Sequence, residues 1–246
     1  MAKLKVLLLA GTREGVVLNQ RLFELGFSLI TSLAGVTKNP PALKGRVLSN
    51  GFQEVGGLSA FLQTEEIGAV IDATHPFAAQ MSQKASAECE RQGITYLRYH
   101  RRPWQKVVRD QWINVRDMSE AGEAAINFKR LFLTIGRKEV VAFEQVPADF
   151  FLLRSVEEVA FNPVTAEVML IRDRGPFQVA AERELLTRYQ IDAIVSKNSG
   201  GAATYGKIEA ARDLGIPVIM ITPPEYSSDN QFSDLNELIS YLKSLS

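Results

Sequence analysis

The 246-residue chain carries 28 basic and 28 acidic side chains, so no net charge draws its whole surface to nucleic acid or to a membrane. Its single cysteine, Cys89, excludes an internal disulfide framework and a cysteine-cluster metal site. Hydrophobic residues make up 46% of the sequence, which is typical of a globular chain with a buried core.

The first apolar run, Val6–Ala10, is too short to cross a membrane and lacks a signal-peptide cleavage pattern, so we expect a buried strand and a cytoplasmic protein. Apolar runs then alternate with segments of helical spacing, which is typical of a parallel sheet flanked by helices. The first part of the chain has predicted strands at Lys5–Ala10, Ser28–Ser32, Arg46–Leu48, Ala69–Ala73 and Thr95–Arg98. Its predicted helices are Val16–Leu25, Leu58–Glu65 and Ala78–Gln92.

A second alternating series follows Pro103 and Trp104. Its predicted strands are Trp112–Val115, Leu131–Ile135, Phe150–Ser155, Glu167–Ile171, Ala193–Ser196 and Val218–Ile221. Its predicted helices are Ser119–Phe128, Lys138–Phe143, Gln178–Tyr189, Tyr205–Leu214 and Ser233–Leu245. The sequence therefore predicts an α/β protein with two Rossmann-like domains, at residues 1–99 and 104–246. Because ligands of open parallel sheets bind beyond the strand ends, we expect an active-site cleft between the two domains.

The turn after the first strand has features of a phosphate-binding site. Gly11 allows close approach of a phosphate, Thr12 adds a hydroxyl, and the following helix offers free N–H groups beside Arg13 and Glu14. The full glycine fingerprint of dinucleotide-binding proteins is missing, since Arg13 replaces its second glycine. Spacing alone leaves two interpretations open: nucleotide binding, or a tight turn that needs glycine for its geometry.

The second strand indicates which nucleotide the first domain would bind. NAD enzymes usually place an acid at the end of this strand to hold the ribose 2′-hydroxyl. Here the strand ends without an acid, and Ser32 and Lys38 stand nearby. A hydroxyl and a cation suit a 2′-phosphate, which favours NADPH over NADH, although Lys38 could equally be a solvated loop charge.

Polar residues also follow the fourth strand, in the segment from Asp72 to Phe77. Thr74 and His75 stand at the strand end, and Pro76 suits a first helical turn. His75 could donate a proton or bond a cofactor, or it could serve a structural hydrogen bond. Asp72 could be a buried cap for a neighbouring loop.

The second domain repeats the pattern of polar groups after strands. Gly136 and Arg137 follow one strand, Arg172 and Arg174 follow another, and a third leads into the segment 196–205. In that last segment a cation, an amide, a hydroxyl and two glycines suit the oxygens of a phosphate or carboxylate. They are Lys197, Asn198, Ser199, Gly200 and Gly201. Two histidines 25 positions apart, without an HExxH or CxxC motif, predict no catalytic metal.

Taken in order, these motifs resemble the precorrin-6A reductases and the related cobalt-precorrin-6A reductases. The resemblance runs from about residue 4 to residue 221, and its most specific parts are Asp72–Phe77 and Lys197–Gly201. One departure is Val36, since the family often has arginine there, which weakens the transfer of the 2′-phosphate role.

The resemblance implies NADPH-dependent reduction of one macrocycle double bond of precorrin-6A, or of its cobalt form, to precorrin-6B in cobalamin biosynthesis. Because the corrin precursor carries many carboxylates, we expect it to meet cationic cleft residues that follow strands: Arg13, Arg137, Arg172, Arg174 and Lys197. Each of these could instead be a solvated surface charge or pair with a nearby acid. We expect a monomer or small homo-oligomer. His75 and Lys197 are the expected catalytic acids, although solvent could also supply the proton. The substrate contacts are expected from Arg137, Arg174 and Lys197 to Gly201, and the cofactor contacts from Gly11–Glu14, Ser32, Lys38 and Thr74–Phe77. The alternatives are another NADPH-dependent reductase with a small substrate, and a non-catalytic dinucleotide sensor.

Overall fold

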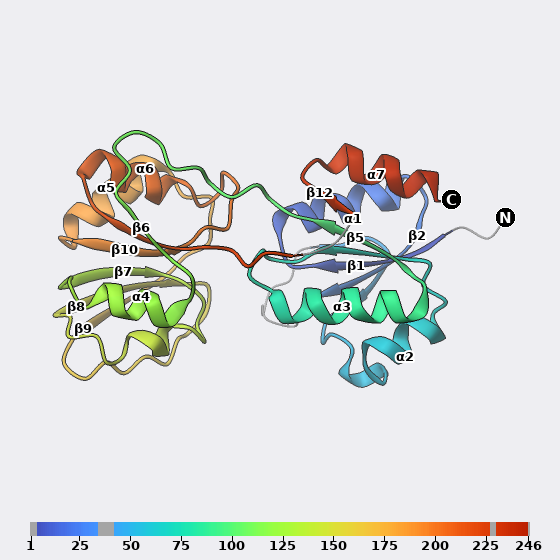
Figure 1. Ribbon diagram of the computed structural model, residues 1–246, viewed down its shortest axis with the longest axis horizontal. Coiled ribbons are helices and arrows are strands. Elements are labelled where there is room, and N and C mark those ends of the chain that lie inside the picture. The colour runs from blue at the N-terminus through green and yellow to red at the C-terminus, as the bar shows by residue number, and fades with distance from the viewer. Residues whose placement is uncertain (1–3, 34–41, 227–229, 246) are drawn as a thin grey trace. The chain divides into compact units, whose positions relative to one another are not determined.

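The computed structural model describes residues 4–33, 42–226 and 230–245, and the chain divides into two compact units. Unit 1 consists of residues 1–101 and 224–246, and unit 2 of residues 102–223. The end of the chain therefore returns to the first unit (Figure 1). The predicted second domain, 104–246, is corrected to end at residue 223.

Unit 1 contains a six-stranded parallel sheet with the order β12-β5-β4-β1-β2-β3. The strands are β1 (Lys5–Ala10), β2 (Ser28–Leu33), β3 (Arg46–Leu48), β4 (Ala69–Ala73), β5 (Thr95–Tyr99) and β12 (Gln231–Phe232). The helices are α1 (Arg13–Glu24), η1 (a 3₁₀ turn, Gln53–Val55), α2 (Gly57–Thr64), α3 (Ala79–Gln92) and α7 (Leu235–Ser244). Because helices cover both faces, β1 and β4 are buried along nearly their whole length.

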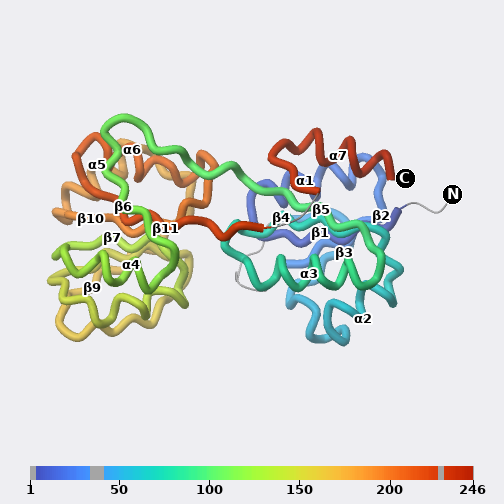
Figure 2. Tube along the Cα trace, in the orientation of Figure 1, coloured from blue at the N-terminus to red at the C-terminus, as the bar shows by residue number. Residues whose placement is uncertain are grey.

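The last stretch of the chain joins unit 1 for two physical reasons. Strand β12 extends the sheet by pairing with β5, and α7 buries Leu238 and Leu242 in the same core as Leu18 and Leu22 of α1. Figure 2 shows α7, drawn in red, beside the blue α1. A two-residue strand has no sequence periodicity of its own, so β12 was not predicted.

Unit 2 also contains a six-stranded parallel sheet, in the order β6-β11-β10-β7-β8-β9. The strands are β6 (Trp112–Val115), β7 (Arg130–Thr134), β8 (Phe150–Ser155), β9 (Glu167–Arg172), β10 (Ala193–Lys197) and β11 (Val218–Ile221). The helices are α4 (Met118–Ala125), η2 (Val140–Phe143), α5 (Val179–Arg188) and α6 (Gly206–Leu214). Helices α5 and α6 pack on one face of this sheet through Leu186 and Ile208.

The predicted strands and nearly all predicted helices are confirmed, with ends that shift by a few residues. Segment 138–143 is corrected from an α-helix to the 3₁₀ turn η2. Helix α1 begins at Arg13, earlier than predicted, because Thr12 caps it. Cys89 is buried in the core of unit 1, and burial raises the pKa of its thiol to about 12, as expected for an unreactive packing residue.

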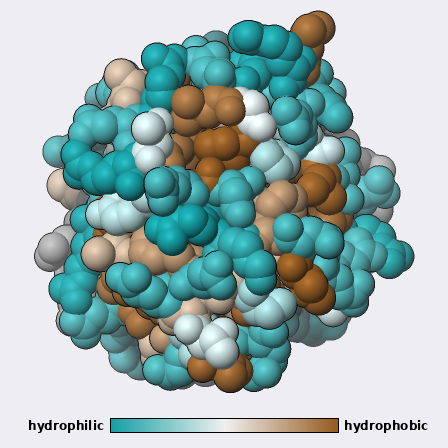
Figure 3. Space-filling view, turned by 90° about the vertical axis from the view of Figure 1, so that its left-hand side faces the viewer, coloured by the Kyte–Doolittle hydropathy of each residue, from teal (hydrophilic) through white to brown (hydrophobic). Residues whose placement is uncertain are grey.

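Apolar residues occur both in the helices and on one face of unit 2. No helix in the described residues is long and apolar enough to cross a membrane. The side of unit 2 shown in Figure 3 is mainly hydrophilic, with small apolar patches separated by polar groups. Single apolar side chains on a surface are ordinary and indicate no interface.

Candidate active site

Each sheet has one position where its strand order reverses. In unit 1 the chain builds outward from β1 to β2 and β3, and then crosses to β4 and β5 on the other side of β1. The reversal point lies between β1 and β4, and open parallel sheets bind their ligands at this point. Gly11 follows β1 and Thr74 follows β4, so the fold brings the two predicted motifs of unit 1 together.

Thr12 fixes the turn that follows β1. Its hydroxyl donates to the carbonyl of Ala73 at 2.8 Å and accepts from the amide of Gly15 at 3.1 Å, so one side chain ties the helix start to β4. The amide of Val16 bonds the Thr12 carbonyl at 3.3 Å. The N–H groups of Arg13 and Glu14 have no partner within the helix, and the positive end of the helix dipole lies beside them.

The two glycines of this turn have different roles. A Cβ on Gly15 would lie 3.1 Å from the Ala10 Cβ and 3.3 Å from its Cα, so glycine is needed there for close packing of α1 on β1. A Cβ on Gly11 would meet only Thr74 Cα at 3.8 Å and His75 N at 3.9 Å, which is ordinary contact. The turn at Gly11 has an unexceptional φ, so the fold itself does not require glycine there.

Glu14 and Ser32 are placed firmly by the surrounding structure. The carboxylate of Glu14 forms an ion pair with Arg101 at the end of unit 1's first segment, and both side chains are mostly buried. Ser32 is buried near the end of β2, opposite Leu9 of β1. The side chain of Arg13 is exposed. Lys38 lies outside the described residues.

Asp72 is the centre of a buried hydrogen-bond network. Its carboxylate accepts from the Thr74 amide (2.9 Å) and hydroxyl (2.6 Å), from the Tyr96 hydroxyl (2.7 Å) and from the guanidinium of Arg98 (2.7 Å). Asp72 and Arg98 are 0% and 1% exposed, so this ion pair is shielded from water. Burial, and then the nearby Asp72 carboxylate, raise the pKa of Tyr96 and keep its phenol neutral. The structure thus supports the reading of Asp72 as a cap that shapes the segment beginning at Thr74.

The segment from His75 to Ala78 forms a tight turn. The Ala78 amide donates to the His75 carbonyl at 2.8 Å, and the Phe77 amide donates to His75 Nδ1 at 3.3 Å. An accepting Nδ1 suits a neutral imidazole with its proton on Nε2. Helix α3 begins only at Ala79, so Pro76 is corrected from a first helical turn to the turn before the helix.

Arg98 and Tyr226 are among the contributors to this site that were not predicted. Arg98 lies directly beside Asp72 in the register of β5 and β4, so an arginine within an apolar strand was an available signal. The ring of Tyr226 lies 3.6 Å from the Arg98 guanidinium carbon, and its hydroxyl donates to the Pro76 carbonyl at 2.6 Å. No local pattern could have placed Tyr226 there.

Unit 2 has an equivalent reversal point between β7 and β10. The hydroxyl of Thr134 donates to the Val195 carbonyl at 2.9 Å and joins the two strands, much as Thr12 does in unit 1. Lys197 ends β10, and its ammonium pairs with the carboxylate of Glu139. The other oxygen of Glu139 accepts from the Gly136 amide at 2.8 Å. Glu139 was not predicted as a site residue.

The remaining predicted cations of unit 2 differ in their surroundings. Arg137 is about half exposed and pairs with Glu157 at 2.8 Å. Arg174 is exposed, and its amide bonds the Asp173 carboxylate at 2.7 Å.

Asn198 holds the segment that enters unit 2. Its side-chain oxygen accepts from the Trp104 amide at 2.7 Å, and its side-chain nitrogen donates to the Trp104 carbonyl at 2.9 Å. The Trp104 indole donates to the Gly201 carbonyl at 2.8 Å. Gly200 and Gly201 have φ values of 64° and 78°, which favour glycine. Asn198 and Ser199 are both buried.

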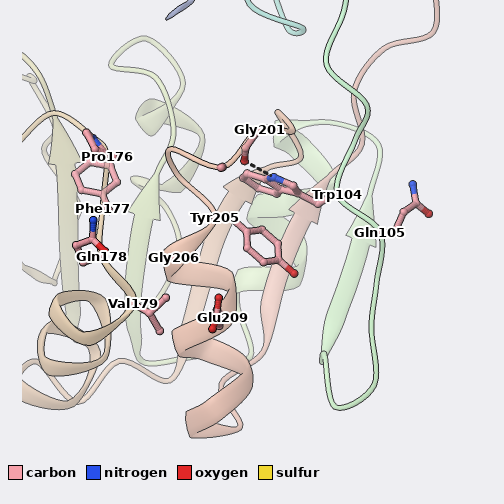
Figure 4. A pocket seen from close by; sticks show the side chains of 11 residues that line it. Trp104, Gln105, Pro176, Phe177, Gln178, Val179, Gly201, Tyr205, Gly206 and Glu209 are labelled. Carbon is pink, nitrogen blue, oxygen red and sulfur yellow. Dashed lines mark hydrogen bonds between the residues drawn. The ribbon is translucent and has the colours of Figure 1, made fainter. Parts of the chain in front are cut away.

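A pocket of about 530 Å³ lies where α5 and α6 begin (Figure 4). Trp104 and Tyr205 form one wall of it, with ring centroids 5.6 Å apart, and Phe177, Val179 and Glu209 also line it. Glu209 is the one charged residue among the described lining residues. An acidic, aromatic pocket suits a carboxylate poorly, so we expect acidic groups of a ligand at the cations near β7 and β10 instead.

A buried lysine lies next to this pocket. The ammonium of Lys207 donates to the Thr204 carbonyl at 3.1 Å and lies 5.3 Å from the Trp104 ring centroid. Burial lowers the pKa of Lys207 to about 8, with the Glu182 carboxylate acting in the opposite direction. Glu182 is itself buried in a two-bond pair with Arg154, at 2.6 and 3.0 Å.

Comparisons with known proteins cover nearly the whole chain. A family model described as precorrin-6x reductase CbiJ/CobK matches residues 5–243. A precorrin-6A reductase of a Sinorhizobium species is 41% identical over 90% of this chain and 85% of its own length. The Rhodobacter capsulatus precorrin-6A reductase is 36% identical, covering 97% of this chain and 95% of its own length. The cobalt-precorrin-6A reductase of Methanothermobacter thermautotrophicus is 29% identical, covering 98% of this chain and 84% of its own length.

A solved structure of CobK precorrin-6A reductase matches with a TM-score of 0.89 and 36% identity. It covers 98% of this chain, and the match extends over 97% of the solved chain. The match supports the assignment of two parallel-sheet units to this sequence.

Proposed function

The chain belongs to the precorrin-6x reductase family, and on that premise we propose that it reduces precorrin-6A to precorrin-6B with NADPH in cobalamin biosynthesis. We propose the metal-free form as the substrate, and not the cobalt form, because the relatives named precorrin-6A reductase are more similar to this chain than the one named cobalt-precorrin-6A reductase. The observation that carries the proposal is the pairing of the Gly11 and Thr74–Phe77 turns at the reversal point of unit 1, in a chain of this family.

The turn at Gly11 fits the pyrophosphate of a dinucleotide. The described protein atoms leave room at this glycine, and two helix-start amides are unbonded within α1. A phosphate accepted there would gain charge-assisted hydrogen bonds and the helix dipole. The proposed cofactor contacts are Gly11, Thr12, Arg13, Glu14, Ser32, Lys38, Thr74, His75, Pro76 and Phe77.

The absence of an acid at the end of β2 supports NADPH over NADH. An aspartate or glutamate there would hold the ribose 2′-hydroxyl and repel a 2′-phosphate. Ser32 stands near this strand end instead, and we assign it a contact with the 2′-phosphate or its ribose. Lys38 is proposed as the cation for the same group.

When bound, NADPH supplies the hydride that reduces the double bond. The chain must place the acceptor carbon, exclude water and provide a proton to the adjoining carbon. His75 is one proposed proton donor in its imidazolium form, with Nε2 as the donating nitrogen because the Phe77 amide lies against Nδ1. Lys197 Nζ is the other.

The carboxylates of the macrocycle are assigned to unit 2. The positive charges proposed to bind these carboxylates come from Arg137, Arg174 and Lys197. The loop proposed to contact the substrate beside Lys197 contains Ser199, Gly200 and Gly201. Asn198 is proposed to act by holding this loop on the Trp104 backbone, since both ends of its amide bond that residue.

An assay of NADPH oxidation with and without precorrin-6A tests the proposal. We expect the protein to oxidise NADPH only when precorrin-6A is present, and to oxidise NADH more slowly. NADPH binding without turnover would favour a dinucleotide sensor. Turnover of small unsaturated compounds, with precorrin-6A inert, would favour a different reductase.

A further inference from the structure

The reversal point of unit 2 holds a carboxylate that belongs to the protein. The two oxygens of Glu139 are held separately, one by the amide of Gly136 at 2.8 Å and the other by the ammonium of Lys197. An amide and an ammonium around one anion are the contacts that a bound carboxylate makes. The location is the one at which parallel sheets bind ligands.

Gly136 shows that space is kept for this anion. A Cβ on Gly136 would lie 2.8 Å from Glu139 Oε2 and 3.5 Å from its carboxyl carbon, and would meet no other described atom within 4 Å. By contrast, a Cβ on Gly206 would lie 2.5 Å from the Phe177 carbonyl, so backbone packing requires that glycine. The space beside Gly136 is therefore limited by the Glu139 carboxylate and not by the packing of the sheet.

The Glu139 carboxylate is also accessible enough for a ligand carboxylate to compete with it for Lys197. Its side chain is 30% exposed and that of Lys197 is 15% exposed, so the cation is mostly shielded while the acid is partly solvated. Glu139 comes from the short segment ahead of the 3₁₀ turn η2, outside the strands that fix Gly136 and Lys197 in place. Moving this side chain breaks no strand pairing.

We propose that Gly136 and Lys197 form a carboxylate-binding subsite, which Glu139 fills until a carboxylate of the macrocycle replaces it. This inference rests on the proposed function, because the substrate supplies the incoming carboxylate. Glu139 then lowers substrate affinity, since each binding event must first displace it. It also keeps the Lys197 ammonium paired and oriented when no substrate is present.

The test is a titration of the protein with precorrin-6A in the absence of NADPH, followed by the absorbance of the macrocycle. Glu139→Gln keeps the bond from Gly136 and removes the competing charge, so we expect about fivefold tighter binding, equal to roughly 1 kcal/mol. Glu139→Ala should tighten binding as well. In the steady-state assay these variants should lower KM.

A double-mutant comparison shows whether the gain passes through Lys197. Lys197→Met should weaken binding by about tenfold, and adding Glu139→Gln to it should change binding by less than about twofold. Glu184→Gln, which removes a carboxylate from an exposed pair with Arg188, is the matched control and should bind like the parent.

The outcomes separate the two proposals. If the parent protein neither binds nor reduces precorrin-6A, the proposed function is wrong. A second outcome is that the parent does both, while folded Glu139 variants bind precorrin-6A equally well or more weakly than the parent. In that case Glu139 only holds Lys197 in position, and the proposed subsite is rejected. A gain that persists in the Lys197→Met background would likewise reject it.

Discussion

The hydroxyl of Tyr226 donates a hydrogen bond to the carbonyl of Pro76 at 2.6 Å, although the two residues are 150 positions apart. The same ring lies on the buried guanidinium of Arg98, which in turn pairs with Asp72. The chain thus reaches Tyr226 only after it has completed unit 2, and this returning segment then supports the turn that carries His75. The proposed cofactor site of unit 1 depends on residues from both ends of the sequence.

Removing the Tyr226 hydroxyl should loosen that turn. We expect Tyr226→Phe to lower the free energy of unfolding by about 1 kcal/mol, and to weaken NADPH binding by a similar amount, roughly fivefold. Fluorescence titration and denaturant unfolding measure the two effects. Tyr241→Phe, at a half-exposed ring that packs on Phe232, is the control and should change neither. Unaltered NADPH affinity in folded Tyr226→Phe would show that the turn does not depend on this bond.

Substitutions at the two glycines after β1 should have different effects, one on NADPH binding and the other on stability. Gly11→Val should leave the thermal midpoint almost unchanged and weaken NADPH binding strongly, because its side chain enters space that the fold leaves open. Gly15→Ala should instead cost about 1–3 kcal/mol of stability, because its Cβ crowds Ala10. A Gly11→Val protein that folds and binds NADPH like the parent would show that the turn serves structure alone.

The ion pair between Asp72 and Arg98 should dominate the stability of unit 1. Breaking a buried pair leaves an uncompensated charge, so Asp72→Ala should cost about 3–5 kcal/mol. Urea unfolding followed by circular dichroism measures this loss. Glu184→Gln, in an exposed pair, should cost less than about 1 kcal/mol. Equal losses for the two variants would mean that the Asp72 network carries little of the stability.

Lys207 should make stability depend on alkaline pH. Burial holds its folded-state pKa near 8, below the ordinary value of 10.5, so the folded state binds fewer protons between these values. The free energy of unfolding should therefore rise with pH for this group across that window, and the penalty should be complete below about pH 8. Lys207→Met should be more stable than the parent by about 1–3 kcal/mol at neutral pH, with the difference shrinking toward pH 10.5. A difference that does not vary with pH would contradict this account.

The strands were predictable because each is a short apolar run buried on both faces, as in Val6–Ala10. The turns after the strands were predictable because glycine and polar residues gather there, as at Gly11 and Gly136. The end of the second domain was not predictable, because the sequence of the returning segment does not indicate that β12 pairs with β5.

Side-chain partners were the least predictable part of the site. The sequence predicted Lys197 and Asn198 as ligand contacts but did not identify their protein partners, which are Glu139 for the first and the Trp104 backbone for the second. Such pairings depend on which loops the topology brings together, and loop conformation has no simple period. The Asp72–Arg98 pair was the exception, because strand register alone places the two side by side.

The proposed function requires hydride transfer from NADPH to the macrocycle of precorrin-6A. The most direct measurement uses NADPH carrying deuterium at the transferable position of the nicotinamide, with mass spectrometry of the macrocycle after a single turnover. The account predicts that the macrocycle gains one deuterium from the cofactor and one hydrogen from solvent. A reduced macrocycle with no deuterium from either face of the nicotinamide, or no reduction by folded, NADPH-bound protein, would contradict it.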